Sequence, residues 1–337
     1  MHRVSTRFAG VDAARGLAIL GMLWAHTAAD GTRQSLADGR SSVLFATLLG
    51  CSVGLITGGA RPPRGVDRRT ALASVALRGL ALIVLGLVLW TLGTPVAVVL
   101  DTYGALLLVL LPLVLAPTAV VAGVGVLAAL AGPLVVRAVG ADLSTPFSSE
   151  RLPSLLGEWF VTGYYPGVVF AAYLCAGLVV ARADLGRRAT LVAMLGGGAA
   201  ASLLGYGGAA LLGLDASAHA NSTAEALGSG GLAIALIGGL ELLCTATATR
   251  RPARTVLAPL VAAGRMPLTI YAGQLVVLAA WLATPAAGDP PWIESWSLLG
   301  GLALASLVLA LLWQRFVGKG PLEWGLTRLT TVRSTRA

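Results

Sequence analysis

An all-α bundle of about ten transmembrane helices, with both chain termini in the cytoplasm, is the fold class that the sequence predicts. The first observation is composition, because 56% of the 337 residues are hydrophobic and only 12% are charged. The mean hydropathy of +0.83 is far above the range of water-soluble domains. The second observation is a series of long apolar runs, and the third is the alternation of arginine between them.

Each predicted span is an apolar run of roughly 20 residues, the length that crosses a hydrocarbon core of about 30 Å. The runs cover residues 11–29, 41–59, 71–92, 96–115, 118–138, 162–181, 189–213, 227–248, 257–283 and 295–315. Only Ala116 and Pro117 separate the fourth run from the fifth, so a tight hairpin is expected there. The whole chain, 1–337, is predicted to be one integral membrane domain that ends in a short basic cytoplasmic tail at 318–337.

Basic residues alternate between the connections, as the positive-inside rule requires. One set of connections holds most of them: Arg3, Arg7, Arg61, Arg64, Arg68, Arg69, Arg182, Arg187, Arg188, Arg250, Arg251, Arg254, Arg315, Lys319, Arg328, Arg333 and Arg336. The other set holds Arg33, Arg40, Arg137 and Arg151 and most of the loop carboxylates. The first set is assigned to the cytoplasm, so the chain is predicted to be a multi-pass plasma-membrane protein. Loop charge explains the net charge of +9, and no nucleic-acid partner is expected.

The first span, GVDAARGLAILGMLWAHT, carries Asp12, Arg15 and His26 on one side of the predicted helix. At about 1.5 Å per residue, Asp12 and His26 are roughly 21 Å apart along the helix axis. Ionisable side chains inside a span are costly, and for that reason they mark candidate sites. The stripe is therefore expected to connect the two faces of the membrane.

Near the cytoplasmic face the topology gathers Asp12, Arg15, Arg78 and Arg265. Arginines in such a vestibule can hold phosphate or pyrophosphate through charge-assisted hydrogen bonds. A structural ion pair between Asp12 and Arg15, tying the first helix into the bundle, is an equally weighted alternative. In a straight ninth span Gln274 would lie about 13 Å deeper than Arg265, facing the bundle interior near the first helix.

Near the outer face lie further polar and aromatic residues: His26, Asp30, Arg40, Asp101, Tyr103, Tyr164, Tyr165, His219 and Glu225. A histidine there can act as a general base, because its reference pKa of about 6.5 is close to working pH. The alternative is a histidine bonded to a loop carbonyl. Cys51, Cys175 and Cys244 show no short Cys or His spacing, so neither a metal site nor a disulfide framework is expected.

Several segments carry a family resemblance. The opening RFAGVDAARGLAILGMLWAHT, through Arg7, Asp12, Arg15, Gly16 and His26, resembles the first helix of the transmembrane acyltransferase superfamily, in particular bacterial relatives of heparan-alpha-glucosaminide N-acetyltransferase. Other segments also resemble this family, namely GRSSVLFATLLGCSVGLITGG, YGALLLVLLPL, YYPGVVFAAYLCAGLVVAR and GRMPLTIYAGQLV. FVGKGPLEWGLTRLT is similar to the C-terminal signature of YeiB-type membrane proteins. Relatives often carry histidine where this chain has Gln274.

The resemblance implies an acyltransferase that moves an acyl group, with acetyl expected, from cytosolic acyl-CoA to an extracytoplasmic sugar or cell-envelope acceptor. The donor would be bound by Asp12, Arg15, Arg78, Arg265 and Gln274. The catalytic residues would be His26 as base, Asp30 or Glu225 orienting it, and Arg40 stabilising the oxyanion. Acyl-CoA would be a co-substrate, with no tightly bound cofactor and no metal, and a homodimer is left open.

Two other classes of function compete with this hypothesis. A transporter or flippase for a lipid-linked or small anionic solute would use the same intramembrane charges to bind solute or couple protons. A noncatalytic scaffold is the third reading, since glutamine at 274 cannot exchange protons near neutral pH. The sequence contains no phosphate-binding loop, nucleotide fingerprint, GxSxG or HExxH motif, so any catalytic site must be assembled from the helices.

Overall fold

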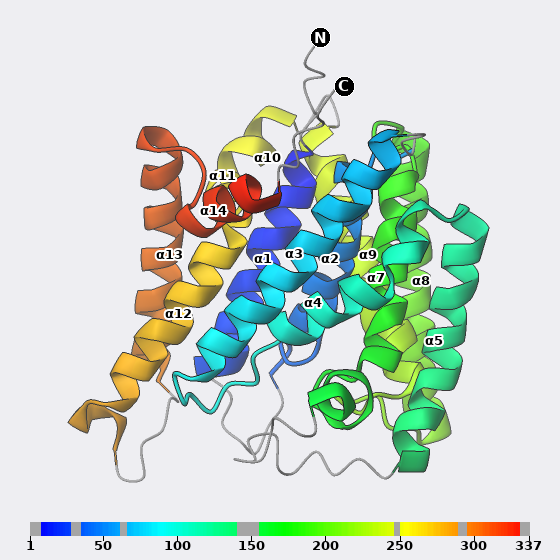
Figure 1. The fold of residues 1–337 in the computed structure, drawn as a ribbon, viewed down its shortest axis with the longest axis horizontal. Coiled ribbons are helices and arrows are strands. Elements are labelled where there is room, and N and C mark those ends of the chain that lie inside the picture. Colours follow the sequence, from blue (N-terminus) through cyan, green and yellow to red (C-terminus); the bar gives the residue numbers. More distant parts are fainter. Residues whose placement is uncertain are drawn as a thin grey trace.

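The computed structural model describes residues 8–27, 35–60, 66–139, 155–245, 250–288 and 295–330. Within these ranges the chain forms helices and no β-strand, which confirms the predicted all-α class. The long helices stand side by side in one bundle, and successive ones run in opposite directions between its two ends (Figure 1).

The elements follow the predicted apolar runs closely. In chain order they are α1 (Ala9–Thr27), α2 (Arg40–Ile56), α3 (Val66–Trp90), α4 (Leu100–Val109), η1 (Leu111–Leu115), α5 (Thr118–Val139), η2 (Glu158–Thr162), α7 (Gly167–Arg182), α8 (Arg188–Leu212), α9 (Thr223–Thr245), α10 (Arg250–Val256), α11 (Ala258–Gly264), α12 (Pro267–Leu282), η3 (Pro285–Ala287), α13 (Trp296–Phe316) and α14 (Pro321–Thr330). Every predicted run overlaps one helix or two consecutive ones, and the expected hairpin at Ala116 and Pro117 joins η1 to α5.

Among the described residues, five helices are long and apolar enough to cross a membrane, and up to seven spans result if each bent helix pair counts as one. The protein is therefore a helical membrane bundle. The figure of ten spans stays a prediction, because α2 and α4 have only 17 and 10 residues. The central helix α1 is continuous over 19 residues but is not among the five, and it carries the polar groups described below.

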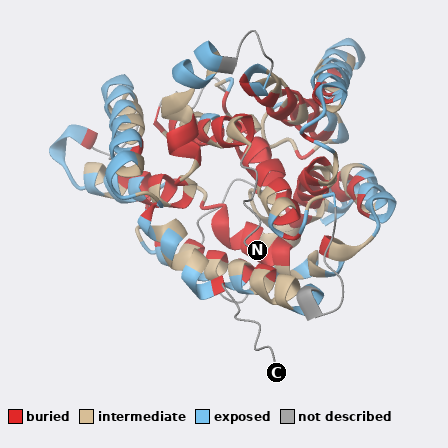
Figure 2. Ribbon diagram, turned by 90° about the horizontal axis from the view of Figure 1, so that it is seen from above, coloured by how far each residue is buried: buried red, intermediate tan, exposed pale blue. Residues whose placement is uncertain are grey.

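Helix α1 lies in the interior and packs against α2, α9, α11, α12 and α13. Small residues allow this close approach, since a Cβ on Gly16 would overlap the backbone of Leu260 in α11, and one on Gly10 would overlap the backbone of Glu241 in α9. Buried residues gather on the inner sides of the helices and exposed ones on the outer rim (Figure 2). The exposed rim is apolar, as Leu203 on α8 and Leu304 on α13 show, which is the pattern expected for contact with lipid.

The two ends of the bundle differ in charge. One end of the bundle holds the start of α1, the start of α3, the α7–α8 junction, α10, α11 and α14 (Figure 1). The described basic residues in or beside these elements include Arg68, Arg69, Arg182, Arg187, Arg188, Arg251, Arg254, Arg265, Lys319 and Arg328. We call this the arginine-rich end and the opposite one the arginine-poor end. The positive-inside rule predicts that the arginine-rich end faces the cytoplasm.

The ninth predicted run is not one straight span. It is broken into α11 and α12, whose axes differ by 85°, and Arg265 lies in the break. Pro267 opens α12 because proline is compatible with the first turn of a helix but not with the interior of a continuous one. The straight ninth span assumed for Gln274 is therefore wrong. Gln274 lies seven residues after Pro267 on α12, a rise of about 10 Å along that helix, and its depth in the membrane stays a prediction.

Part of the predicted C-terminal tail is a helix. Residues 321–330 form α14, which packs on α3 and α12. The Glu323 carboxylate accepts hydrogen bonds from the backbone N–H groups of Leu268 at 2.6 Å and Thr269 at 3.1 Å. These N–H groups have no partner within α12, so a carboxylate stabilises the start of that helix.

Arg182 holds the short helices before α5 in place. Its guanidinium donates hydrogen bonds to the carbonyl oxygens of Ala116 at 2.6 Å, Val114 at 2.9 Å and Leu113 at 3.2 Å. Loss of these charge-assisted bonds in Arg182→Gln is expected to lower the free energy of unfolding by about 2 kcal/mol. Thermal unfolding of the two proteins in the same detergent measures the effect. The exposed Arg187→Gln is the matched control, and equal losses in both variants would contradict this role.

Candidate functional site

An ion-paired network, which we call the inner charge network, joins α1 to its neighbours at the arginine-rich end. It consists of Asp12, Arg15 and Arg265. Arg15 donates to the Asp12 carboxylate at 2.6 Å, to the Gly264 carbonyl at 3.0 Å and to the Ser52 hydroxyl at 3.1 Å. Arg265 donates through Nε to the other Asp12 oxygen at 3.3 Å. The structure therefore brings three of the predicted donor-binding residues together.

The two arginines of the inner charge network differ in what they can still bind. The Arg15 side chain is 16% exposed and is surrounded by protein acceptors. The Arg265 side chain is 35% exposed, and its Nη1 donates to Gln314 of α13 at 3.3 Å. Arg15 therefore mainly ties α1 to α2 and α11, whereas Arg265 keeps donor groups accessible at the helix break.

Glu241 is a buried acidic residue that the sequence reasoning missed. It is 2% exposed, and its carboxylate accepts hydrogen bonds from the backbone N–H groups of Gly10 at 2.7 Å and Val11 at 3.3 Å. It thereby satisfies the free N–H groups at the start of α1. The signal was a lone carboxylate in the apolar stretch GGLELLCT, which costs too much inside a span to lack a partner.

Toward the arginine-poor end, α1 and α12 bring together His26 and Gln274. Nδ1 of His26 lies 3.3 Å from Nε2 of Gln274, and the imidazole ring meets the Tyr271 ring edge-on at a centroid distance of 6.5 Å. Gln274 is 3% exposed, and its Oε1 is buried without a hydrogen-bond partner among the described residues. The structure thus places Gln274 with the candidate base and not with the inner charge network.

Glu225 organises a separate loop between α8 and α9. Its carboxylate accepts hydrogen bonds from the backbone N–H groups of His219 at 2.8 Å and Asn221 at 2.7 Å. Both residues have left-handed backbones, with φ of 61° and 49°, and such conformations persist where the surroundings hold them. Among the described contacts, Glu225 bonds to this loop and not to His26. Its placement therefore supports a structural role in the loop rather than the predicted role of orienting His26.

Aromatic rings surround His219 at the same end of the bundle. Its imidazole packs on Tyr164 at a centroid distance of 4.0 Å and meets Tyr165 edge-on at 5.5 Å. Arg40 packs its guanidinium 4.8 Å from the centroid of the Tyr206 ring. Asp101 accepts a hydrogen bond from the Trp159 indole at 3.1 Å. Asp30, the remaining predicted catalytic residue, lies outside the described residues.

Burial lowers the pKa of His219 from 6.5 to about 4. As pH falls below 6.5 the unfolded chain takes up this proton while the folded protein does not, so stability is highest above pH 6.5 and declines toward pH 4. The loss is expected to reach about 3 kcal/mol at most. Thermal unfolding between pH 7 and pH 4 should therefore show a steeper decline for the wild type than for His219→Asn, which tolerates a left-handed backbone. Parallel curves would contradict this contribution.

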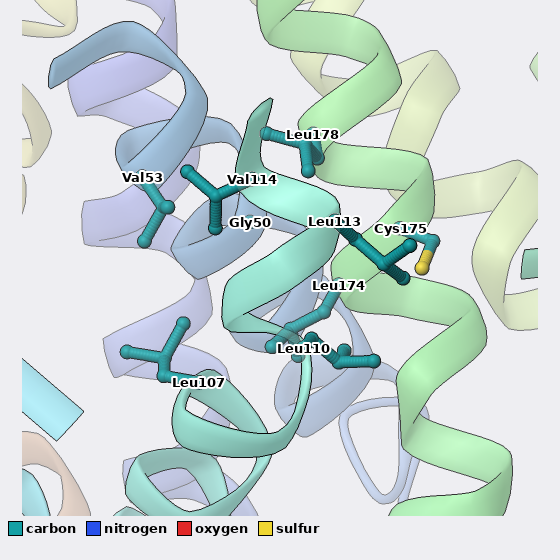
Figure 3. Close-up of a pocket in the computed structure, with 9 residues that line it drawn as sticks. All are labelled: Gly50, Val53, Leu107, Leu110, Leu113, Val114, Leu174, Cys175 and Leu178. Atoms are coloured by element: carbon teal, nitrogen blue, oxygen red, sulfur yellow. The ribbon is translucent and has the colours of Figure 1, made fainter. Parts of the chain in front are cut away.

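One cavity in the bundle lacks polar groups. It measures about 20 Å³ and lies where α2, the α4–η1 segment and α7 meet (Figure 3), lined by Gly50, Val53, Leu107, Leu110, Leu113, Val114, Leu174, Cys175 and Leu178. A cavity of this size holds about one small molecule of the size of water, and an apolar lining keeps it dry. It offers no group for catalysis.

The central helix α1 thus contributes Asp12 and Arg15 to the inner charge network and His26 to the His26–Gln274 pair. Residues 179–333 match the model of a family described as "Protein of unknown function (DUF418)". The match begins in α7 and covers Glu225, Arg265 and Gln274, and it fits the YeiB-type signature near the C-terminus, but it does not include the first span. No curated protein matches the chain. The family description assigns no activity, so the function is argued from the site.

Proposed function

We propose that the protein is a membrane acyltransferase that moves an acyl group, with acetyl expected, from acyl-CoA at the arginine-rich end to a sugar or cell-envelope acceptor at the arginine-poor end. The observation that carries the proposal is the His26–Gln274 pair, an imidazole bonded to a buried amide near the far end of the central helix. The resemblance of the first span to transmembrane acyltransferases also supports His26 as the general base.

The amide of Gln274 can hold the imidazole in either neutral form. When Nε2 of Gln274 donates to Nδ1, the imidazole carries its proton on Nε2 and can donate to a developing oxyanion. When the amide is rotated, Oε1 accepts from Nδ1–H, and Nε2 of His26 is left with a lone pair that can accept a proton. Rotation also gives the buried Oε1 the partner that it lacks. The pair can therefore support a base and an oxyanion donor.

The proposed reaction needs one proton transfer and one exchange of bonds at the thioester. His26 accepts the proton of the acceptor hydroxyl or amine, and the freed oxygen or nitrogen attacks the thioester carbonyl carbon. The carbon–sulfur bond then breaks, and the coenzyme A thiolate leaves with the electron pair and receives a proton. The products are an acyl ester or amide and free coenzyme A, with His26 returned to its neutral form.

On the donor side, Arg265 is the residue best placed to meet phosphate groups. It borders the break between α11 and α12, is the most exposed member of the inner charge network and keeps guanidinium N–H groups available. Asp12 and Arg15 fix the position of α1 beside this break, because Arg15 bonds to Gly264 at the end of α11. We assign Arg265 to donor binding, and Asp12 and Arg15 to positioning it.

A transporter of a small anionic solute is the second candidate. Arg78 favours it, because this arginine lies halfway along α3 and belongs neither to the inner charge network nor to the His26–Gln274 pair. An acyltransferase converts its substrates, whereas a transporter releases them unchanged, so the chemical identity of the product separates the two functions.

The test uses purified protein in nanodiscs, radiolabelled acetyl-CoA and a panel of amino sugars, with products separated by chromatography. The proposal predicts a labelled acetyl ester or amide of at least one acceptor and equal release of coenzyme A. If the protein bound acetyl-CoA but formed no product with any acceptor, the result would count against acyl transfer. Absence of acetyl-CoA binding, with no difference between the wild type and Arg265→Gln, would exclude the donor assignment.

A further inference from the structure

Arg78 lies at the middle of α3, twelve residues from both Val66 and Trp90. At about 1.5 Å per residue it is roughly 18 Å from either end of the helix, near the middle of the candidate membrane span Arg68–Trp90. Val75 and Leu82, three residues before and four after on the same side, are 0% and 5% exposed, whereas Leu80 and Val84 on the opposite side are exposed. Arg78 is therefore on the side of α3 that faces the bundle.

The guanidinium of Arg78 has no protein partner in the part of the chain that the structure describes. Its Nε is buried and makes no hydrogen bond, and no salt bridge joins the side chain to a described carboxylate. The residue as a whole is only partly buried, so protein does not enclose the side chain completely. This contrasts with Arg15 and Arg182, whose guanidinium groups are each bonded to three protein oxygens.

An unpaired arginine at this depth is too costly to be a structural element. Arginine stays protonated in proteins, so it cannot avoid the cost by losing its charge. Inward-facing charges in spans without an acidic partner mark ligand pathways. A planar guanidinium binds the paired oxygens of a carboxylate or a phosphate through parallel hydrogen bonds.

We propose that Arg78 is the cation of a separate anion site on the inward side of α3, halfway between the two ends of that helix, which takes the carboxylate or phosphate oxygens of a ligand. The site is distinct from Arg265, which lies at the arginine-rich end, and it is not part of the His26–Gln274 pair. It does not depend on the proposed function, since a substrate of either an acyltransferase or a transporter can carry such a group.

The test compares the thermal unfolding of full-length wild type and Arg78→Met in nanodiscs of neutral phosphatidylcholine. With chloride as the only small anion, Arg78→Met is expected to unfold at the same temperature as the wild type or higher, because it removes an unpaired charge. Succinate and inorganic phosphate, at matched ionic strength, should raise the unfolding temperature of the wild type and leave that of Arg78→Met unchanged. The control is Arg137→Met, an exposed arginine of α5, which should respond as the wild type does.

Two results would overturn the site. One is a lower unfolding temperature for Arg78→Met without added anion, as a structural arginine requires. The other is equal stabilisation of both proteins by succinate and phosphate. A second set of nanodiscs containing phosphatidylglycerol identifies the source of the oxygens. A shift that needs this lipid assigns an anionic lipid, and a shift on addition of succinate or phosphate to discs of phosphatidylcholine alone assigns a soluble anion. None of these readouts requires acyl transfer, so the anion site and the proposed function can fail separately.

Discussion

Replacement of His26 by alanine is expected to reduce kcat for acyl transfer by about 10²- to 10⁴-fold, the range that a general base contributes. The reason is that His26 is the imidazole at the arginine-poor end that Gln274 holds by a hydrogen bond. The KM for acetyl-CoA should change little, because the proposed donor contact is Arg265. Initial rates over a range of acetyl-CoA concentrations separate the two constants.

The controls for His26 distinguish chemistry from folding. His26→Asn can still bond to Gln274 but cannot exchange a proton near neutral pH, so it should lose transfer while it unfolds at nearly the wild-type temperature. His219→Asn changes the other described histidine and should retain transfer at pH 7. If His26→Asn were as active as the wild type, His26 would not be the base.

Replacement of Asp12 by asparagine is expected to lower the free energy of unfolding by about 3–5 kcal/mol, the usual cost of removing one partner from a buried ion pair. The Asp12 side chain is only 5% exposed, and its two oxygens receive Arg15 and Arg265. Without that charge the guanidinium of Arg15 stays among α1, α2 and α11 with neutral acceptors only. Unfolding of the wild type and Asp12→Asn in the same detergent, followed in an assay calibrated in free energy, measures the loss of stability.

A double-mutant cycle shows whether the loss belongs to the pair. Arg15→Gln added to Asp12→Asn should recover part of the stability, because it removes the charge that the first substitution left unpaired. The same cycle with the exposed Arg187→Gln should be additive. Additive losses for Asp12 and Arg15 would contradict the inner charge network as a stabilising element.

The sequence predicted the arrangement of the helices well because apolar length and charge alternation act directly on membrane insertion. The runs at 118–138 and 295–315 match α5 and α13 to within two residues. Prediction failed where local chemistry interrupts a run. Pro267 follows the break in the ninth run at Arg265. The helix α14 within the predicted tail was not anticipated, nor was its contact through Glu323 with the start of α12.

The candidate site was predicted in part. The one-sided spacing of Asp12, Arg15 and His26 pointed to α1, which carries two members of the inner charge network and the histidine of the His26–Gln274 pair. The prediction that Gln274 lies near the first helix is confirmed. Spacing along one helix could not show at which residue Gln274 meets α1, so Gln274 was grouped with the donor residues, and Glu241 was missed. Arg78 was grouped with the inner charge network because topology gives the depth of a residue only coarsely.

The most direct test of the proposed function is transfer across a sealed membrane. Proteoliposomes with one orientation of the protein would receive radiolabelled acetyl-CoA at the arginine-rich end, with the amino-sugar acceptor enclosed on the other side. The proposal predicts labelled acetyl-acceptor inside, unlabelled coenzyme A outside, and loss of both with His26→Asn. Labelled acetyl-CoA recovered intact inside the vesicles, with no acetylated acceptor, would contradict it and indicate transport.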